Sequence, residues 1–101
     1  MNLEAISANL TDLLEQILME KKQPFFTYNR GHEIDSNITT QSIELKTKEK
    51  NILLAFIYDH DQQNLVFKLL RQTGEITPNE VALIENIVSQ NLSKFKELFH
   101  S

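Results

Sequence analysis

The sequence predicts an α+β fold in which a helix, a four-stranded antiparallel sheet and a second helix follow one another along a single domain, residues 1–101. Three observations predict it. Apolar residues recur at helical spacing near both ends of the chain, four segments between them are typical of strands, and the links between these segments are short. Short links imply an up-and-down meander, and two apolar helix stripes need a common surface. We therefore expect both helices on one face of the sheet.

The first helix is expected over residues 3–20. Its apolar positions are spaced by three and four residues, which places them on one side of a helix. They are Leu3, Ile6, Leu10, Leu13, Leu14, Ile17 and Leu18. Asn2 is a suitable N-cap, and Pro24 is expected to stop the helix because proline cannot continue it.

The strands are expected over residues 24–29, 40–48, 51–58 and 65–72. The second alternates apolar and charged residues, which predicts one face in contact with water. The third, NILLAFIY, is apolar on both faces and should be the central, most buried strand. RGHEIDSN, residues 30–37, is expected to be a loop with Gly31 as its most flexible point, and DHDQQN, residues 59–64, a turn.

The second helix is expected to begin at Pro78 and to run almost to the end of the chain. Thr77 and Glu80 form a capping box around Pro78, and Ile76 can pack against Val81 as a hydrophobic staple.

A helix of this length would extend about 33 Å, whereas a strand of eight residues spans about 26 Å. Its far end should therefore overhang the sheet. Phe95, Leu98 and Phe99 would then need another partner, which is either the first helix or a second copy of the chain.

The C-terminal half, from NILLAFIY through TPNEVALIENIVSQNLSKFKEL, resembles the end of a sensor domain of the GAF type, with Thr77, Glu80, Leu83 and Ile84 at the positions of its cap, acid and apolar pair. Such domains carry a longer middle section that forms the ligand pocket, and here RGHEIDSNITT stands in its place. The resemblance implies a shortened relative that associates through its terminal helices.

The segment Asp59-His60-Asp61 is the densest group of candidate metal ligands or acid/base groups. In an extended strand the two carboxylates would lie on one side and the imidazole on the other. In a meander, the links after the first and third strands lie at the same end of the sheet, which would bring His32 close to this segment. A divalent metal site is conceivable there. The alternative is the polar tip of a hairpin, which these residue types favour.

Other catalytic and cofactor sites find little support in the sequence. There is no cysteine, which excludes thiolate chemistry and disulfides, and two glycines are too few for a phosphate-binding loop. We therefore expect no enzyme and no cofactor.

Charge and hydropathy restrict the partners and the location. The net charge of −4 argues against a nucleic-acid partner, and no apolar run is long enough to cross a membrane. Glu4 and Asp12 stand where a signal peptide would carry positive charge, so we expect a cytoplasmic protein.

Phe26 and Tyr28 share one side of the first strand. If both helices cover the other side of the sheet, these rings belong to an exposed apolar strip, which would mark a partner surface. If one helix crosses this side instead, the strip is part of the core.

The leading functional hypothesis is a small, acidic, non-enzymatic interaction or regulatory module that forms a homodimer and binds a protein partner, for example as an inhibitor, immunity protein or chaperone. A metal-dependent or acid/base enzyme that uses the loop end of the sheet is one alternative. A truncated GAF-like sensor of small molecules is the other.

Overall fold

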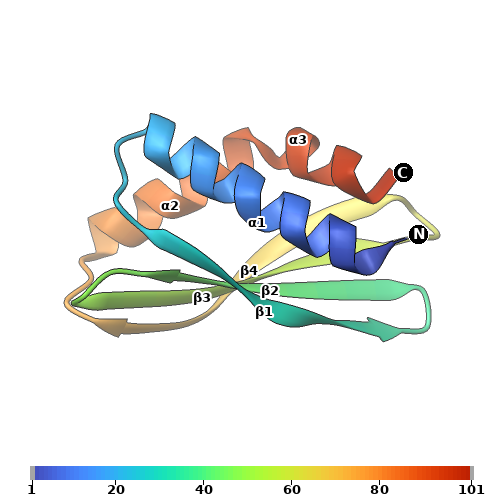
Figure 1. Cartoon of the computed structure of the whole chain (residues 1–101), viewed down its shortest axis with the longest axis horizontal. Coiled ribbons are helices and arrows are strands. Elements are labelled where there is room, and N and C mark those ends of the chain that lie inside the picture. Colours follow the sequence, from blue (N-terminus) through green and yellow to red (C-terminus); the bar gives the residue numbers. More distant parts are fainter. Residues whose placement is uncertain (1, 101) are drawn as a thin grey trace.

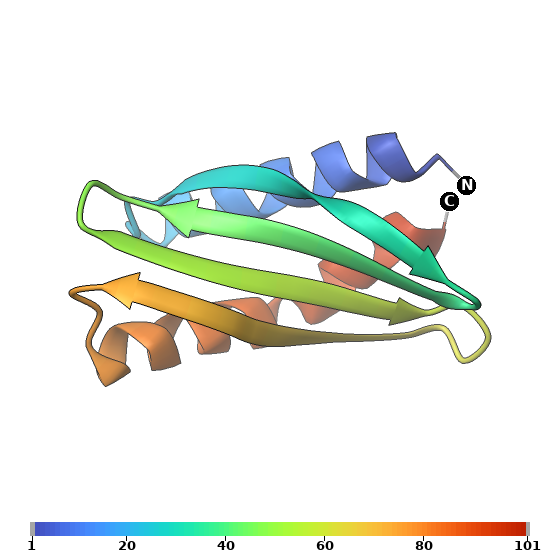
Figure 2. The ribbon, with the colours of Figure 1, turned by 90° about the horizontal axis from the view of Figure 1, so that it is seen from below.

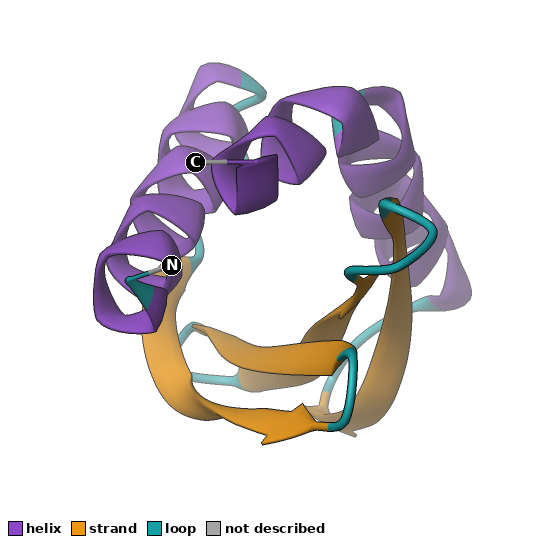
Figure 3. Cartoon of the chain, turned by 90° about the vertical axis from the view of Figure 1, so that its right-hand side faces the viewer, coloured by secondary structure: helices purple, strands orange, loops and turns teal. Residues whose placement is uncertain are grey.

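A computed structural model describes residues 2–100 and confirms the predicted fold class. Four antiparallel strands pair in the order β1-β2-β3-β4, and all helices lie on one side of the sheet (Figure 1, Figure 3). The elements are α1 Leu3–Glu20, β1 Phe26–Asp35, β2 Ile38–Lys46, β3 Lys50–Asp59, β4 Asn64–Gly74, α2 Pro78–Gln90, α3 Leu92–Glu97 and the 3-10 turn η1 Leu98–His100. We call the side of the sheet that faces the helices the inner face, and the opposite side the outer face.

Helix α1 has the expected bounds and the expected cap. The Asn2 side chain accepts a hydrogen bond from the Ala5 backbone N–H at 3.2 Å, which satisfies one of the free donors of the first turn. The apolar stripe of α1 is buried, with Leu10, Leu14 and Leu18 fully enclosed. This helix packs against β1 and covers that side of the inner face (Figure 2).

Strand β1 is longer than predicted, and the loop expected over residues 30–37 is wrong. The chain remains in the sheet as far as Asp35 and reverses through Ser36 and Asn37 alone. The pairing with β2 shifts between Asn29 and His32, which makes a β-bulge that includes Gly31 at a φ of +106°. A glycine inside a strand often marks such a bulge, which is why Gly31 does not indicate a loop here.

The central strand is buried on its inner face as expected. Its inner side chains are Ile52, Leu54, Phe56 and Tyr58. They form one core with the apolar stripes of the helices.

The C-terminal helix is not continuous, which corrects the prediction of a single overhanging helix. It is interrupted at Asn91, whose backbone leaves the helical region and whose side-chain N–H donates to the Ile87 carbonyl at 2.8 Å. The break redirects α3 and η1 over the sheet. Phe95 then packs on Phe56 with ring centroids 4.9 Å apart, and Phe99 stacks on Tyr58 at 4.7 Å.

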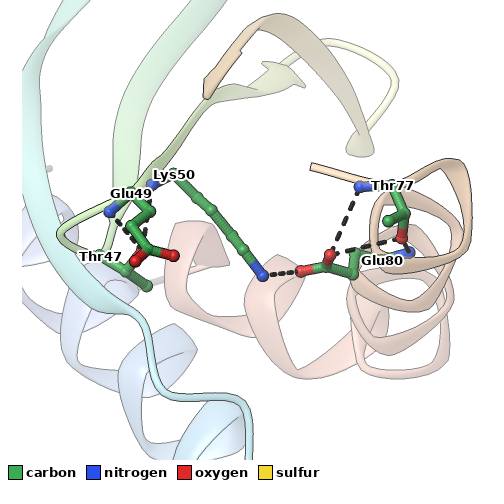
Figure 4. A network of polar contacts seen from close by, with 5 residues as sticks. All are labelled: Thr47, Glu49, Lys50, Thr77 and Glu80. Atoms are coloured by element: carbon green, nitrogen blue, oxygen red, sulfur yellow. Dashed lines mark hydrogen bonds and ion pairs between the residues drawn. The ribbon is translucent and has the colours of Figure 1, made fainter. Parts of the chain in front are cut away.

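The capping box at the start of α2 is present as predicted, and it is connected to the sheet (Figure 4). The Thr77 hydroxyl accepts from the Glu80 N–H at 3.2 Å, and one Glu80 oxygen accepts from the Thr77 N–H at 3.4 Å. The other Glu80 oxygen pairs with the Lys50 ammonium, which lowers the pKa of this carboxyl below its usual value. One glutamate thereby joins the first turn of α2 to the first residue of β3.

Strand β4 ends at Gly74, where the backbone passes directly over the turn between β2 and β3. Gly74 has a φ of +90°, and a Cβ atom at this position would lie 1.9 Å from the Glu49 carbonyl oxygen. Gly31 also has a positive φ, but a Cβ atom there would meet nothing within 4 Å. A substitution at Gly31 therefore introduces backbone strain alone, whereas one at Gly74 introduces strain and a steric clash.

Gly74→Ala should lower the free energy of unfolding by about 3 kcal/mol or more, because strain and a backbone clash add. Gly31→Ala should cost only about 1–2 kcal/mol, the cost of the strained φ alone. Urea denaturation of the two variants checks this difference. Equal losses would contradict the close approach of Gly74 to the turn.

Candidate functional site

The three residues at the tip of β3 are used to build the hairpin. One Asp59 carboxylate oxygen accepts from the Asn37 side chain at 2.8 Å and from the backbone N–H groups of Asp61 and Gln62 at 3.0 and 3.2 Å. His60 Nε2 lies 2.6 Å from the Thr39 hydroxyl. These contacts are those of a closed turn that is tied to the neighbouring hairpin.

The two turns at this end of the sheet do meet, as the topology predicts. The His60 backbone N–H donates to the Asn37 carbonyl at 2.9 Å. His32, however, lies further back in β1, where its Nδ1 atom is 3.4 Å from the Ser7 hydroxyl of α1. Within residues 2–100, no three histidine, aspartate or glutamate side chains are grouped in a way that could hold a metal ion.

A small hollow of about 280 Å³ lies beside these turns, at the N-terminal end of α1. Its surface is mostly apolar, and its polar residues are Ser36, Asn37, Thr39 and His60. Thr39 and His60 are bonded to each other, and the Asn37 side chain donates to Asp59.

A buried polar cluster that was not predicted lies under α1, opposite the bulge of β1. The Gln41 amide N–H donates to the Asn29 side chain at 2.7 Å and to the Gly31 carbonyl at 3.0 Å, and its oxygen accepts from the Ser7 hydroxyl. Gln41 is 1% exposed and Ser7 2%. The Ser7 hydroxyl is therefore committed to the fold and is not an accessible nucleophile, although His32 lies beside it.

The signal for this cluster was present in the sequence. Gln41 stands on the same side of β2 as Ile43 and Leu45, and a glutamine in an apolar row needs hydrogen-bond partners when it is buried. The bulge supplies them, because its extra residue leaves the Gly31 carbonyl without a strand partner.

The outer face of the sheet is uncovered, and it is the main candidate site (Figure 2). It includes four of the seven large apolar side chains that the described residues expose, namely Phe26, Tyr28, Val66 and Leu70. Leu53 and Ile57 lie half-buried between them on β3. The structure therefore leaves the exposed strip that the sequence predicts when both helices take the other face.

The centre of the outer face carries small side chains, and a hollow lies beside them. Ser42 and Ala55 are paired across β2 and β3 and have small side chains. At the β1 side, a hollow of about 330 Å³ is lined by Arg30, Gly31, His32, Glu33, Thr40, Ser42 and Leu70. Leu70 is the extra residue where the pairing of β3 with β4 shifts, and it is 52% exposed.

Arg30 and Glu44 form an ion pair on this face. The Glu44 side chain is 7% exposed and the Arg30 side chain 50%, and Arg30 Nε lies 3.2 Å from the carboxylate. The hydrogen bond from Arg30 is the largest cause that lowers the pKa of Glu44, and one from Asn51 adds to it. The guanidinium also lies over the Tyr28 ring, 5.8 Å from its centroid. The buried carboxylate thus stays charged near neutral pH and fixes Arg30.

The remaining charges of the outer face are separated along the strands. The half nearer to the β2–β3 turn exposes Lys46 and Arg71, and the centre exposes Lys68. Glu33 and Asp35 are exposed in the other half, on β1. The outer face therefore has a cationic half and an anionic half, although the whole chain is acidic.

The residues predicted for a protein interface separate into two groups. Phe26 and Tyr28 are exposed on the outer face, at 68% and 45%. Phe95 and Phe99 are buried in the core of the chain itself, and Leu98 packs against this core. These three were assigned to an overhanging helix, and the break at Asn91 removes that overhang. The first helix and the sheet are their partners.

Comparison with family models, curated proteins and solved structures finds no match for this chain. The resemblance of the C-terminal half to a GAF-type domain stays a prediction. No helix within residues 2–100 is both long and apolar enough to span a membrane.

Gln41→Leu should lower the free energy of unfolding by about 1–3 kcal/mol, because leucine cannot make the hydrogen bonds that the buried Gln41 amide makes with Ser7, Asn29 and Gly31. Gln16→Leu on the exposed side of α1 is the matched control and should change stability by less than about 0.5 kcal/mol. Urea denaturation measures both. A Gln41→Leu variant as stable as the control would contradict a structural role for the cluster.

Proposed function

We propose that the protein is a non-enzymatic interaction module of the cytoplasm that self-associates and binds protein through the outer face of its sheet. The observation that carries the proposal is the concentration of exposed apolar side chains on this one face, from Phe26 and Tyr28 on β1 to Val66 and Leu70 on β4. Exposed apolar surface that is contiguous and bordered by polar groups is typical of protein–protein contacts.

The composition of the outer face supports a protein partner. Aromatic side chains and arginine are enriched at the centres of protein interfaces. Here Tyr28 and Arg30 are adjacent, and Arg30 is held by Glu44 and by the Tyr28 ring before any partner arrives. A side chain that is already ordered loses less conformational entropy on binding.

The polar groups that could support catalysis have structural partners instead. Asp59 closes a turn, His60 pairs with Thr39, and Ser7 is buried against Gln41. A general acid or base needs a hydrogen-bonding route to a substrate. The commitment of these groups to the fold supports a binding function over an enzymatic one.

The double substitution Tyr28→Ser/Leu70→Ser should abolish association while preserving stability to within about 1 kcal/mol, because both side chains are exposed. Light scattering at increasing concentration measures the mass of the wild type and of the variant. With the wild type and the variant as baits in the native source, proteins that bind through this face should be retained only by the wild type.

Leu83→Ser is the control for this experiment. Leu83 is 42% exposed on α2, on the other side of the molecule, so its replacement removes a comparable apolar side chain outside the outer face. The proposal is wrong if the Tyr28/Leu70 variant associates and binds like the wild type, or if Leu83→Ser is the substitution that abolishes binding.

A further inference from the structure

We infer that the outer face is covered by a second copy of this chain, packed face to face so that the cationic half of each copy lies on the anionic half of the other. The inference rests on the proposed function and adds to its self-association the orientation of the contact.

The charge pattern selects the orientation. Two sheets that pack face to face with two-fold symmetry have their axis between the sheets, either along the strands or across them. An axis along the strands places β1 of one copy over β4 of the other and keeps like halves together, which brings Lys46 of one copy near Arg71 of the other. An axis across the strands brings opposite halves together. Because like charges in an interface are costly, the axis across the strands is favoured.

The apolar pattern agrees with the same axis. Ala55 lies at the centre of the outer face, with Leu53 two residues before it and Ile57 two residues after it. A two-fold axis that crosses the strands at Ala55 places Leu53 of one copy opposite Ile57 of the other, and does so twice. Ala55 is 1% exposed and Ser42 is half-buried at this axis, so the contact between the two copies is made by the larger side chains on either side of them.

The size of the face fits a reversible dimer. Four strands spaced by about 4.8 Å, each with about nine residues on the sheet, present roughly 570 Å² per copy. The sheet curves around the helices, so its outer face is convex (Figure 3) and a contact between two copies buries less than roughly 1,100 Å² in total, below the standard range for specific protein complexes. We therefore expect a dissociation constant in the micromolar range.

Pairing through sheet edges is less well supported than pairing through the face. At the β1 edge, the Glu15 carboxylate accepts from the Thr27 N–H at 3.4 Å and from the Thr27 hydroxyl at 2.8 Å. This contact occupies a backbone donor that an added strand would need. At the β4 edge, an antiparallel pair of β4 strands centred between residues 69 and 70 would place Lys68 of one copy opposite Arg71 of the other.

The test reverses the charges of one half at a time. Lys46→Glu/Arg71→Glu gives an outer face that is anionic at both ends, and Glu33→Lys/Asp35→Lys gives one that is cationic at both ends. All four side chains are exposed, so circular dichroism should report an unchanged fold. Sedimentation at low salt should show each variant to self-associate at least about tenfold more weakly than the wild type, because every reversed contact occurs twice.

An equimolar mixture of the two variants provides the decisive result. One all-anionic and one all-cationic face are complementary, so the mixture should form a heterodimer at least as tight as the wild-type dimer, and salt should weaken it. Glu85→Lys/Glu97→Lys, on the helices, changes the net charge as much as Glu33→Lys/Asp35→Lys and is the matched control. It should dimerise like the wild type and should not complement the anionic variant.

Three outcomes overturn the inference. If the wild type stays monomeric at millimolar concentration, the occupant is not a second copy, and the bait comparison with Tyr28→Ser/Leu70→Ser still decides the proposed function. If charge reversal has no effect while Tyr28→Ser/Leu70→Ser abolishes the dimer, the face is correct and the orientation is wrong. If neither set of substitutions affects the dimer, the inference and the self-association through this face both fail.

Discussion

The structure depends on one constraint, which is that all the helices are needed to bury a single face of the four-stranded sheet. The inner face presents a full apolar row on β3, and part of this row is buried by residues beyond α1 and α2. The break at Asn91 provides the rest, because it returns α3 and η1 to the sheet and places Phe95 and Phe99 on the rings of Phe56 and Tyr58. Every helix is thereby committed to the inner face, and the outer face is left with its own apolar side chains.

Two local devices keep this arrangement in register. The bulge at Gly31 is satisfied from inside by Gln41, and the start of α2 is fixed to β3 by the pair of Glu80 with Lys50. Both devices act on the inner side of the sheet. On the outer side, the only ion pair among the described residues is that of Arg30 with Glu44, which lies within the proposed docking surface. The polar groups of the two faces thus have different roles, one in folding and one in presenting a surface.

Much of the fold was predictable because its signals are local. The capping box at Thr77 and Glu80 and the alternation in β2 depend only on neighbouring residues. The capping box is found as predicted, and so is the alternation except at Glu44, which is buried against Arg30. Gly31 and Asn91 were misjudged because their effects depend on distant partners: a bulge needs the Gln41 side chain of the next strand, and a helix break is favoured only when the residues beyond it reach a core. The helical spacing of apolar residues continues through Asn91, so it does not predict where Phe95 and Phe99 are buried.

The candidate site shows the same division. Phe26 and Tyr28 could be assigned to a surface from their spacing alone, whereas the opposition of charges along the outer face appears only when the register of four strands is known. Conversely, Asp59 and His60 form a dense polar group that is compatible with a metal or acid/base site, yet a turn between two apolar strands requires the same residue types. Their hydrogen bonds with Asn37 and Thr39 show that these side chains stabilise the turn.

The most direct test of a docking outer face is the concentration dependence of methyl and ring signals in NMR spectra of the labelled protein. Outer-face groups, such as those of Leu53, Ile57, Val66 and Leu70, should shift as the concentration rises, while Leu54 on the inner face and Leu83 on α2 should stay constant. The account would be contradicted if the shifts were confined to the helices. It would also be contradicted if no signal shifted at any concentration and none shifted when a captured partner was added.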